Sequence, residues 1–278
     1  YQIDSYRKIR NTIRFLLGNL NNFSVNDSVE LEQMPDLEKY ILNKVSQMNT
    51  ELKSLVQNHD YHGIFVKLLN FCTLDLSAFY FDIRKDSLYC DGKDSLKRRS
   101  VSTCLHILFD FLSKWFSPII SFTSEEAWQS RHQNNSTSIL SQTITEKDFT
   151  YSNSNLEKSF DELKRVRKSV TAALEIKRNE KLIGSSLQAK ATIYIPSEIK
   201  QILSTLDLAE MCIVSCVEIK DIAEKTTTSM NFEEEDIFVD ISLAEGDKCQ
   251  RCWTILPEVK DNQDHLCSRC DNVWKSFQ

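Results

Sequence analysis

The residues most able to do chemistry lie near the end of the chain, where four cysteines form two Cys-x-x-Cys pairs. Cys249 and Cys252 form the first pair, Cys267 and Cys270 form the second, and fourteen residues separate the pairs. Each pair can present two thiolates from one tight turn, and four thiolates around one centre are the ligand set of a structural zinc ribbon. Such a closed shell leaves no open coordination position, so the predicted zinc ion holds structure and does not activate water. The alternatives are two unrelated thiol pairs or one redox pair, and the latter would not explain the second pair.

The other five cysteines are typical of a reduced intracellular protein. They are Cys72, Cys90, Cys104, Cys212 and Cys216. An odd number of thiols, mostly inside apolar runs, indicates core residues and not a disulfide framework. No stretch approaches the roughly 20 apolar residues that span a bilayer. We therefore expect a cytoplasmic protein without a membrane segment.

The length and composition predict a mainly helical protein of several domains. A chain of 278 residues has room for two or three domains. It contains only five glycines and four prolines, which favours long helices. It begins at Tyr1, without Met and directly in a helical pattern, so we expect a fragment of a longer protein.

The first 150 residues are predicted to form a helical bundle. Apolar residues recur at steps of three and four over 6–20, 37–55, 65–76 and 101–115. The residues Thr123-Ser124-Glu125-Glu126 predict a capping box that opens a short helix through Trp128. Long helices on short connections indicate neighbours packed side by side.

The rest of the chain is predicted to be a small α+β unit followed by the ribbon. A polar stretch over 133–155 indicates a linker, and a helix with an apolar face follows over 156–174. Apolar and polar residues alternate over 187–195 and 237–243, which predicts two strands. A short helix after Pro196 and an apolar stretch lie between them. The predicted domains are 1–150, 151–245 and 246–278.

No residue pattern indicates a catalytic site. Gly92-Lys93 lacks the earlier glycine that a phosphate-binding loop requires. His59 and His62 are not accompanied by a carboxylate pattern typical of a metal site, so they are interpreted as solvated or packed residues. The acidic run over 233–236 is interpreted as a solvated loop.

Basic residues cluster in three places, although the net charge is −6. Arg7, Arg10 and Arg14 fall on one stripe of the first helix and could form a row of phosphate contacts. Two further clusters lie at 93–99 and along 158–181. Each cluster could equally be a solvated helix face, but three clusters beside a zinc ribbon favour an RNA partner.

The ribbon itself carries matched arginines and two tryptophans. Arg251 and Arg269 take equivalent positions in the two Cys-x-Arg-Cys knuckles, where they could offset the charge of about −2 on a four-thiolate zinc site or face a phosphate backbone. Trp253 follows the first knuckle and Trp274 lies beyond the second. Each could be a stacking platform for an unpaired base or could pack in the ribbon's small core.

Several segments resemble a known enzyme family, in collinear order over essentially the whole chain. They are residues 6–20, 79–89, 117–128 and 173–187 together with the ribbon over 248–270. These stretches are similar to the C-terminal region of bacterial-type isoleucyl-tRNA synthetases. The helical bundle alone would be shared with the valyl, leucyl, methionyl and cysteinyl enzymes.

The resemblance implies a helical-bundle anticodon-binding domain of class I synthetases, and with it a tRNA-recognition function. The parent enzyme would attach isoleucine to its tRNA with ATP and magnesium. The two ATP-site signatures, His-Ile-Gly-His and Lys-Met-Ser-Lys-Ser, are absent here. We therefore expect the catalytic and editing domains upstream and this chain alone to be inactive.

The resemblance also implies the partners, whereas the contacting residues are predicted from the basic stripe of the first helix and from the two knuckles. The expected partner is the anticodon stem-loop of isoleucine tRNA, with no DNA or membrane partner, and the expected state is a monomer. The predicted tRNA contacts are Arg7, Arg10, Arg14, Arg251, Trp253 and Arg269. Two alternatives stay open: a stand-alone zinc-ribbon RNA-binding protein derived from a synthetase, and the equivalent region of a valyl enzyme.

Overall fold

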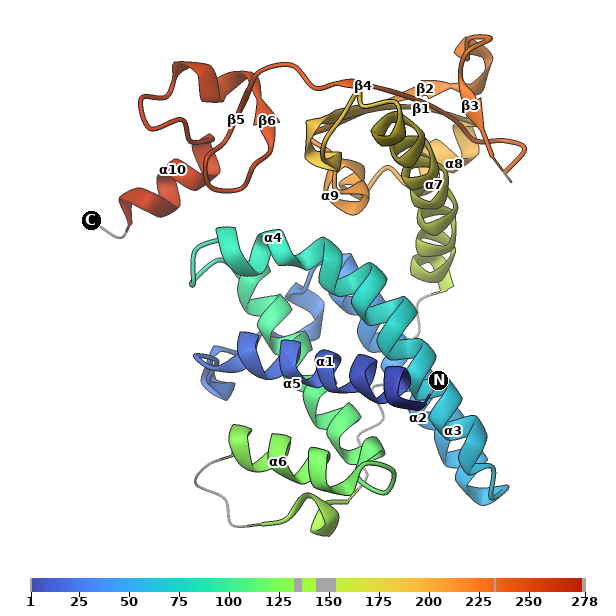
Figure 1. The fold of residues 1–278 in the computed structure, drawn as a ribbon, viewed down its shortest axis with the longest axis vertical. Coiled ribbons are helices and arrows are strands. Elements are labelled where there is room, and N and C mark those ends of the chain that lie inside the picture. The colour runs from blue at the N-terminus through green and yellow to red at the C-terminus, as the bar shows by residue number, and fades with distance from the viewer. Residues whose placement is uncertain (1, 133–136, 144–153, 233, 277–278) are drawn as a thin grey trace. The chain divides into compact units, whose positions relative to one another are not determined.

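The fold is mainly helical, as the composition predicts, with a four-stranded sheet and a two-stranded one in the second half of the described chain (Figure 1). The computed structural model describes residues 2–132, 137–143, 154–232 and 234–276. The chain divides into two compact units, Tyr1–Asn153 and Ser154–Gln278, and each is described by itself. The predicted division into three domains stays a prediction. Most of the predicted linker over 133–155 lies outside the described residues.

The first unit is a helical bundle. Its α-helices are α1 (Gln2–Leu20), α2 (Asp36–Gln57), α3 (Tyr61–Asn70), α4 (Asp82–Cys90), α5 (Leu96–Phe116) and α6 (Ser121–Arg131). Helix α5 is the centre of the bundle, because it packs against α1, α2, α4 and α6. Its side chains are buried along almost its whole length from Ser100 to Phe116. The Ser95 hydroxyl accepts a hydrogen bond from the backbone N–H of Arg98 and so caps the helix where it begins.

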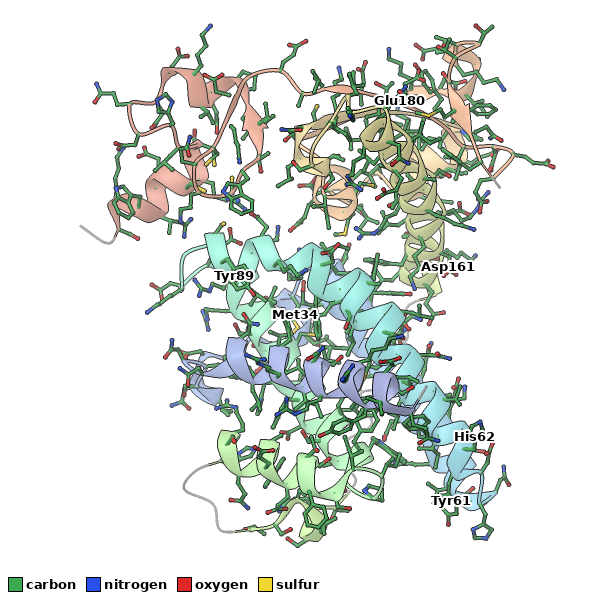
Figure 2. All side chains as sticks on the ribbon, viewed as in Figure 1. Met34, Tyr61, His62, Tyr89, Asp161 and Glu180 are labelled. Atoms are coloured by element: carbon green, nitrogen blue, oxygen red, sulfur yellow. The ribbon has the colours of Figure 1, made fainter. Side chains whose placement is uncertain are left out.

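Helices α3 and α4 are joined by the π-helical segment Phe71–Phe81 into one continuous helical run. By length and composition alone the run Tyr61–Cys90 could cross a membrane, which qualifies the sequence prediction that no stretch could do so. Core helices of soluble proteins pass the same test. Half of the apolar window is buried inside the protein, and the run packs against α1, α2 and α5. Tyr61 and His62 are exposed at the start of this run, where it follows the turn from α2 (Figure 2). Elsewhere in the bundle, Met34 is a buried core residue.

Helix α6 corrects one sequence prediction. The predicted capping box at Thr123 is wrong, because α6 begins at Ser121 and its N-cap residue, Ile120, makes no side-chain cap. The Thr123 hydroxyl instead forms a 3.0 Å hydrogen bond with the Tyr6 hydroxyl of α1. The motif therefore joins two helices and does not open one.

The second unit begins with α7 (Ser154–Asn179), which packs against a four-stranded sheet. The strand order is β2-β1-β4-β3, with bounds Cys216–Asp221, Ala189–Ile195, Phe238–Leu243 and Met230–Asn231 respectively. The two predicted strands are β1 and β4, which pair antiparallel. Strand β2 pairs parallel with β1, and α8 (Ser197–Ile202) and α9 (Leu208–Cys212) lie along the crossover between them. The apolar stretch Ile213–Ile219 begins with Ile213, which ends α9 in the left-handed backbone conformation. The stretch then continues into strand β2.

The C-terminal segment is built on a short hairpin and one helix. Strands β5 (Asp247–Lys248) and β6 (Ile255–Leu256) pair antiparallel, and α10 spans Ser268–Lys275. Gly246 has φ +112°, and a Cβ there would lie 2.2 Å from the backbone carbonyl carbon of Leu256, so only glycine fits this approach. The Ile255 N–H donates to the Ser215 hydroxyl at 2.8 Å, which ties the hairpin to the residues just before β2.

Candidate metal centre and nucleic-acid surface

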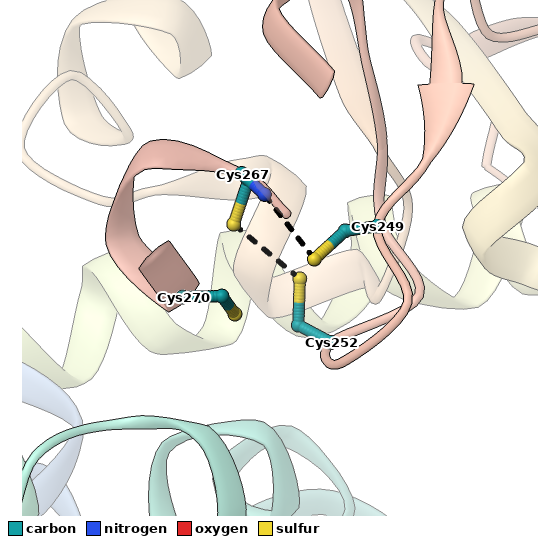
Figure 3. A group of neighbouring side chains, drawn as sticks. All are labelled: Cys249, Cys252, Cys267 and Cys270. Carbon is teal, nitrogen blue, oxygen red and sulfur yellow. Dashed lines mark hydrogen bonds between the residues drawn. The ribbon is translucent and has the colours of Figure 1, made fainter. Parts of the chain in front are cut away.

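The four cysteines of the two knuckles converge on one point (Figure 3). Cys249 and Cys252 lie in the turn between β5 and β6, Cys267 is the N-cap of α10, and Cys270 lies in its first turn. Their sulfur atoms all lie within 4.8 Å of one another, and all four residues are buried. Within the described part of the chain they are the only group of His, Cys, Asp and Glu that could hold a metal ion.

The sulfur geometry fits a tetrahedral zinc ion. A Zn–S bond of about 2.3 Å places the sulfurs of a regular tetrahedron about 3.8 Å apart. The Sγ atoms of Cys252 and Cys267 are 3.7 Å apart, and all four cysteines are free of disulfides. The Cys267 N–H donates to Cys249 Sγ at 3.3 Å, which links the two knuckles. The predicted structural zinc is therefore supported by its ligand set.

The first knuckle holds Trp253 in an unusual backbone conformation. Its φ is +69°, in the left-handed region that favours glycine. The Trp253 N–H donates to the Cys249 carbonyl at 2.9 Å, and the Cys249 N–H donates to the Thr254 carbonyl at 2.9 Å, so the turn fixes this conformation. Backbone strain of this kind in a non-glycine residue gathers at functional sites.

Both tryptophans of the segment are open to solvent. Trp253 is 60% exposed and Trp274 is 49% exposed, which disfavours the interpretation that they pack the ribbon's core. The Lys248 ammonium lies 5.1 Å from the centroid of the Trp253 ring. An open indole face beside a cation is the arrangement on which an unpaired base stacks.

The two knuckle arginines are half-buried. Arg251 Nη1 donates to Cys270 Sγ at 3.7 Å. A guanidinium at this distance offsets part of the negative charge of a four-thiolate site. This contact favours the charge-balancing role for Arg251.

The first basic cluster is the most open one. Arg7, Arg10 and Arg14 are all exposed on α1. Arg7 lies 3.8 Å from the Asp4 carboxylate, in a pair so exposed that it contributes little to stability. Arg10 and Arg14 form no hydrogen bond or ion pair with any residue that the structure describes. The stripe therefore offers cations to an outside partner.

The other two clusters are largely used inside the protein. In the second, Arg98 and Arg99 donate to the backbone carbonyls of Asp91 and Asp27. In the third, Arg165 on α7 binds three carboxylates, those of Glu162, Glu234 and Asp236. The pKa of Arg165 is raised, first by its bond to Glu234. The interpretation of the acidic run as a solvated loop is thus wrong for Glu234 and Asp236. Residue 233 lies outside the described part.

Comparison with known proteins decides the family. Residues 38–193 match the family model described as the anticodon-binding domain of tRNA ligase, which is more than half of the chain. The chain belongs to the tRNA-ligase anticodon-binding domain family. A second family model, the zinc finger found in FPG and IleRS, matches residues 246–273 and so covers all four cysteines. One structural zinc is thereby supported both by this match and by the sulfur cluster.

Several curated proteins that are similar to this chain carry the name isoleucine–tRNA ligase. The protein from Ruegeria pomeroyi is 40% identical over 271 residues, which cover 96% of this chain and 28% of the relative. The one from Pelagibacter ubique is 40% identical over 255 residues, covering 91% and 27%. The one from Listeria monocytogenes is 36% identical over 279 residues, covering 98% and 30%. The chain thus spans under a third of the length of these relatives.

Proposed function

We propose that this chain is the tRNA-recognition part of an isoleucine–tRNA ligase and binds the anticodon stem-loop of isoleucine tRNA. The observation that carries the proposal is the collinear likeness to isoleucine–tRNA ligases, at 40% identity over 271 residues, with the bundle and the zinc segment in the same chain. Amino-acid activation with ATP and magnesium belongs, in this proposal, to a part of the enzyme that the chain does not span. The proposed compartment is the cytoplasm, and the proposed partner in the same polypeptide is the catalytic and editing region.

The open cations of α1 suit the backbone of the stem. Arg7, Arg10 and Arg14 stand one turn or so apart along the helix, which spaces them by about 5 Å. Successive phosphates of one RNA strand lie at a similar spacing, so a row of guanidinium groups can follow the strand. Such contacts set position and carry no sequence information by themselves.

The zinc segment suits the single-stranded loop. The zinc ion, held by Cys249, Cys252, Cys267 and Cys270, supplies a rigid fold and no reaction chemistry. The knuckle it fixes presents Trp253 outward, and Lys248 adds a positive charge at its face. Loop bases can be splayed and stacked in this way, whereas the deep major groove of an RNA duplex cannot easily be read. Arg251 and Arg269 would then approach the loop backbone from the two knuckles.

The test is direct binding of the chain to purified isoleucine tRNA and to the same tRNA with an altered anticodon. We expect the altered anticodon to weaken binding, because the loop bases supply the specific contacts. Valine tRNA serves as the control for a sibling specificity. Equal binding of all three RNAs would contradict anticodon recognition, and tighter binding of valine tRNA would move the chain to the valyl enzyme.

A further inference from the structure

A cavity of about 640 Å³ lies between α1 and α6 in the first unit. The two helices pack side by side (Figure 1). Near their N-terminal ends they are joined by the hydrogen bond between Tyr6 and Thr123, and the cavity lies toward their C-terminal ends. The helices therefore run parallel, and the arginine stripe of α1 leads to the cavity.

The lining of the cavity is polar and cationic. Helix α1 and the turn after it contribute Arg14, Leu17, Gly18, Leu20 and Asn21, and α6 contributes Ser130 and Arg131. No carboxylate is among the residues that line it. Pockets of this volume are large enough for a small ligand. Two guanidinium groups in a lining without a carboxylate favour a ligand that carries negative charge.

Arg131 is only partly satisfied within the protein. Its Nη2 donates to the Phe23 carbonyl at 3.2 Å, which anchors the side chain at the cavity. Its Nε is buried and has no hydrogen-bond partner among the described residues. An unsatisfied buried donor is costly, and a charged one more so. The buried Nε is itself out of reach of a ligand, so an anion would meet the charge of Arg131 where this side chain lines the cavity.

Gly18 is the second sign of a ligand. It lies in the last turn of α1, and a Cβ built there would meet no atom within 4 Å. Its φ is not in the left-handed region, so the backbone does not require glycine. Glycine destabilises a helix relative to alanine. The described part of the unit gives no reason for it, and the free space beside it opens on the cavity.

We propose that this cavity receives one nucleotide of the RNA backbone, with its phosphate between Arg14 and Arg131 and its ribose beside Gly18. This inference rests on the proposed function, and it adds Arg131 and Gly18 to the contacts of the α1 stripe. The source of the anion follows from the proposed function, because an RNA strand that runs along the arginine stripe of α1 reaches the cavity at Arg14.

The experiment compares two substitutions at Gly18 that leave every charge in place. Gly18→Ala is the matched control, because it adds one methyl group to open space. Gly18→Leu places a branched side chain in the cavity, and both residues are good helix formers, so both variants should fold. We expect Gly18→Ala to bind isoleucine tRNA within about twofold of the original chain, and Gly18→Leu to bind about tenfold more weakly or worse. Arg131→Lys should give an intermediate loss. Unfolding curves confirm that each variant is folded.

A third variant separates this inference from the proposed function. Trp253→Ala removes the stacking platform in the other unit and leaves the cavity intact. If Trp253→Ala weakens tRNA binding while Gly18→Leu behaves like Gly18→Ala, the cavity proposal is wrong and the proposed function stands. If the original chain binds no tRNA at all, both are wrong. If millimolar inorganic phosphate alone raises the melting temperature of the original chain but not of Gly18→Leu, the cavity is a free-anion site and the RNA assignment is overturned.

Discussion

Arg84 and Glu38 form a fully buried, two-pronged ion pair at the heart of the bundle. Arg84 Nε lies 2.7 Å from Glu38 Oε1 and Arg84 Nη2 lies 2.8 Å from Glu38 Oε2. The Tyr80 hydroxyl donates to the same carboxylate at 3.1 Å. The side chains of Arg84 and Glu38 are 1% and 0% exposed. The pair fastens α4 and the end of the π-helical segment to α2, so it fixes the register of the whole run from Tyr61 to Cys90.

Breaking this pair should destabilise the bundle strongly. Glu38→Ala leaves the Arg84 guanidinium buried without its partner, and such a loss costs about 3–5 kcal/mol. Urea unfolding followed by circular dichroism measures the change. The matched control is Asp82→Ala, which breaks the exposed pair with Lys85 on the same run and should cost less than about 1 kcal/mol. Equal effects of the two substitutions would contradict a structural role for the buried pair.

The bundle should also lose stability as the pH falls below about 6.5. Burial lowers the pKa of His106 and of His132, and the nearby Asp110 only partly opposes this. Arg131 and Lys114 lower both pKa values further. As the pH falls below about 6.5, the histidines of the unfolded chain take up protons before those of the folded chain do. The free energy of unfolding therefore rises with pH in this range, and the contribution of the two histidines is lost as the pH falls.

Unfolding of the double variant His106→Gln/His132→Gln checks this pH dependence. Its stability should change less between pH 7.5 and pH 5.5 than that of the original chain, where the change comes partly from the histidines. Replacing the exposed His62 is the control, and it should leave the slope unchanged. A double variant with an undiminished slope would assign the acid sensitivity to carboxylates instead.

The sequence predicted the elements better than it predicted what their polar residues do. Helical periodicity located α1, α2, α5 and α7, because a helix that buries one face must repeat its apolar residues. The run through the π-helical segment was shortened, since its apolar residues surround the helix and show little periodicity. Strand β2 was missed because it is a half-buried edge strand within a short apolar stretch.

The roles of most polar residues could not be predicted from the sequence, because these roles depend on partners that are distant along the chain. The four cysteines were identified from spacing alone, because each pair sits on a local turn. The cluster on α7 was different: Arg165 is about 70 residues from Glu234 and Asp236, and no local pattern links them. Arg131 and Gly18 were missed for the same reason, since the cavity exists only once α1 and α6 pack together.

Loss of one zinc ligand should unfold the C-terminal zinc segment (β5, β6 and α10) and leave the helical bundle folded. Cys267→Ser removes one of the four sulfurs, so the chain should lose its stoichiometric zinc. Elemental analysis measures the metal, and circular dichroism should show that most of the helix signal remains, because the bundle forms a separate unit. Cys216→Ser, at an exposed thiol outside the cluster, should keep the zinc. Full zinc content in the Cys267 variant would overturn the ligand assignment.

Removing one arginine of the α1 stripe should flatten the salt dependence of tRNA binding. Each phosphate contact contributes about 0.7–0.9 to the slope of the logarithm of affinity against the logarithm of salt concentration. Arg10→Ala should therefore reduce the slope by roughly that amount, without changing stability, since its side chain is exposed. Lys200→Ala removes an exposed charge from α8 and is the control. A slope unchanged by Arg10→Ala would make this residue part of a solvated face.

Trp253 allows stability and binding to be separated at one position. Its φ of +69° strains any residue except glycine, by about 1–2 kcal/mol. Trp253→Gly relieves that strain, while Trp253→Ala keeps it, so the glycine variant should be the more stable of the two by about 1 kcal/mol. Because the indole is 60% exposed, neither variant loses much buried surface.

In contrast to their stabilities, the tRNA affinities of Trp253→Gly and Trp253→Ala should be lowered alike. Both variants lose the stacking surface and its pairing with Lys248, a loss of about 1–3 kcal/mol per base, or roughly tenfold to a hundredfold in affinity. Trp253→Phe keeps an aromatic face at the same strain and should retain most of the affinity. A residue kept for folding would make the glycine variant unstable as well as weak in binding. A residue kept for RNA would leave it folded, with its zinc, and defective only in binding. Measured together, melting temperature and tRNA affinity decide between these roles, because the backbone conformation is held by the turn and the exposed ring is free to act in binding alone.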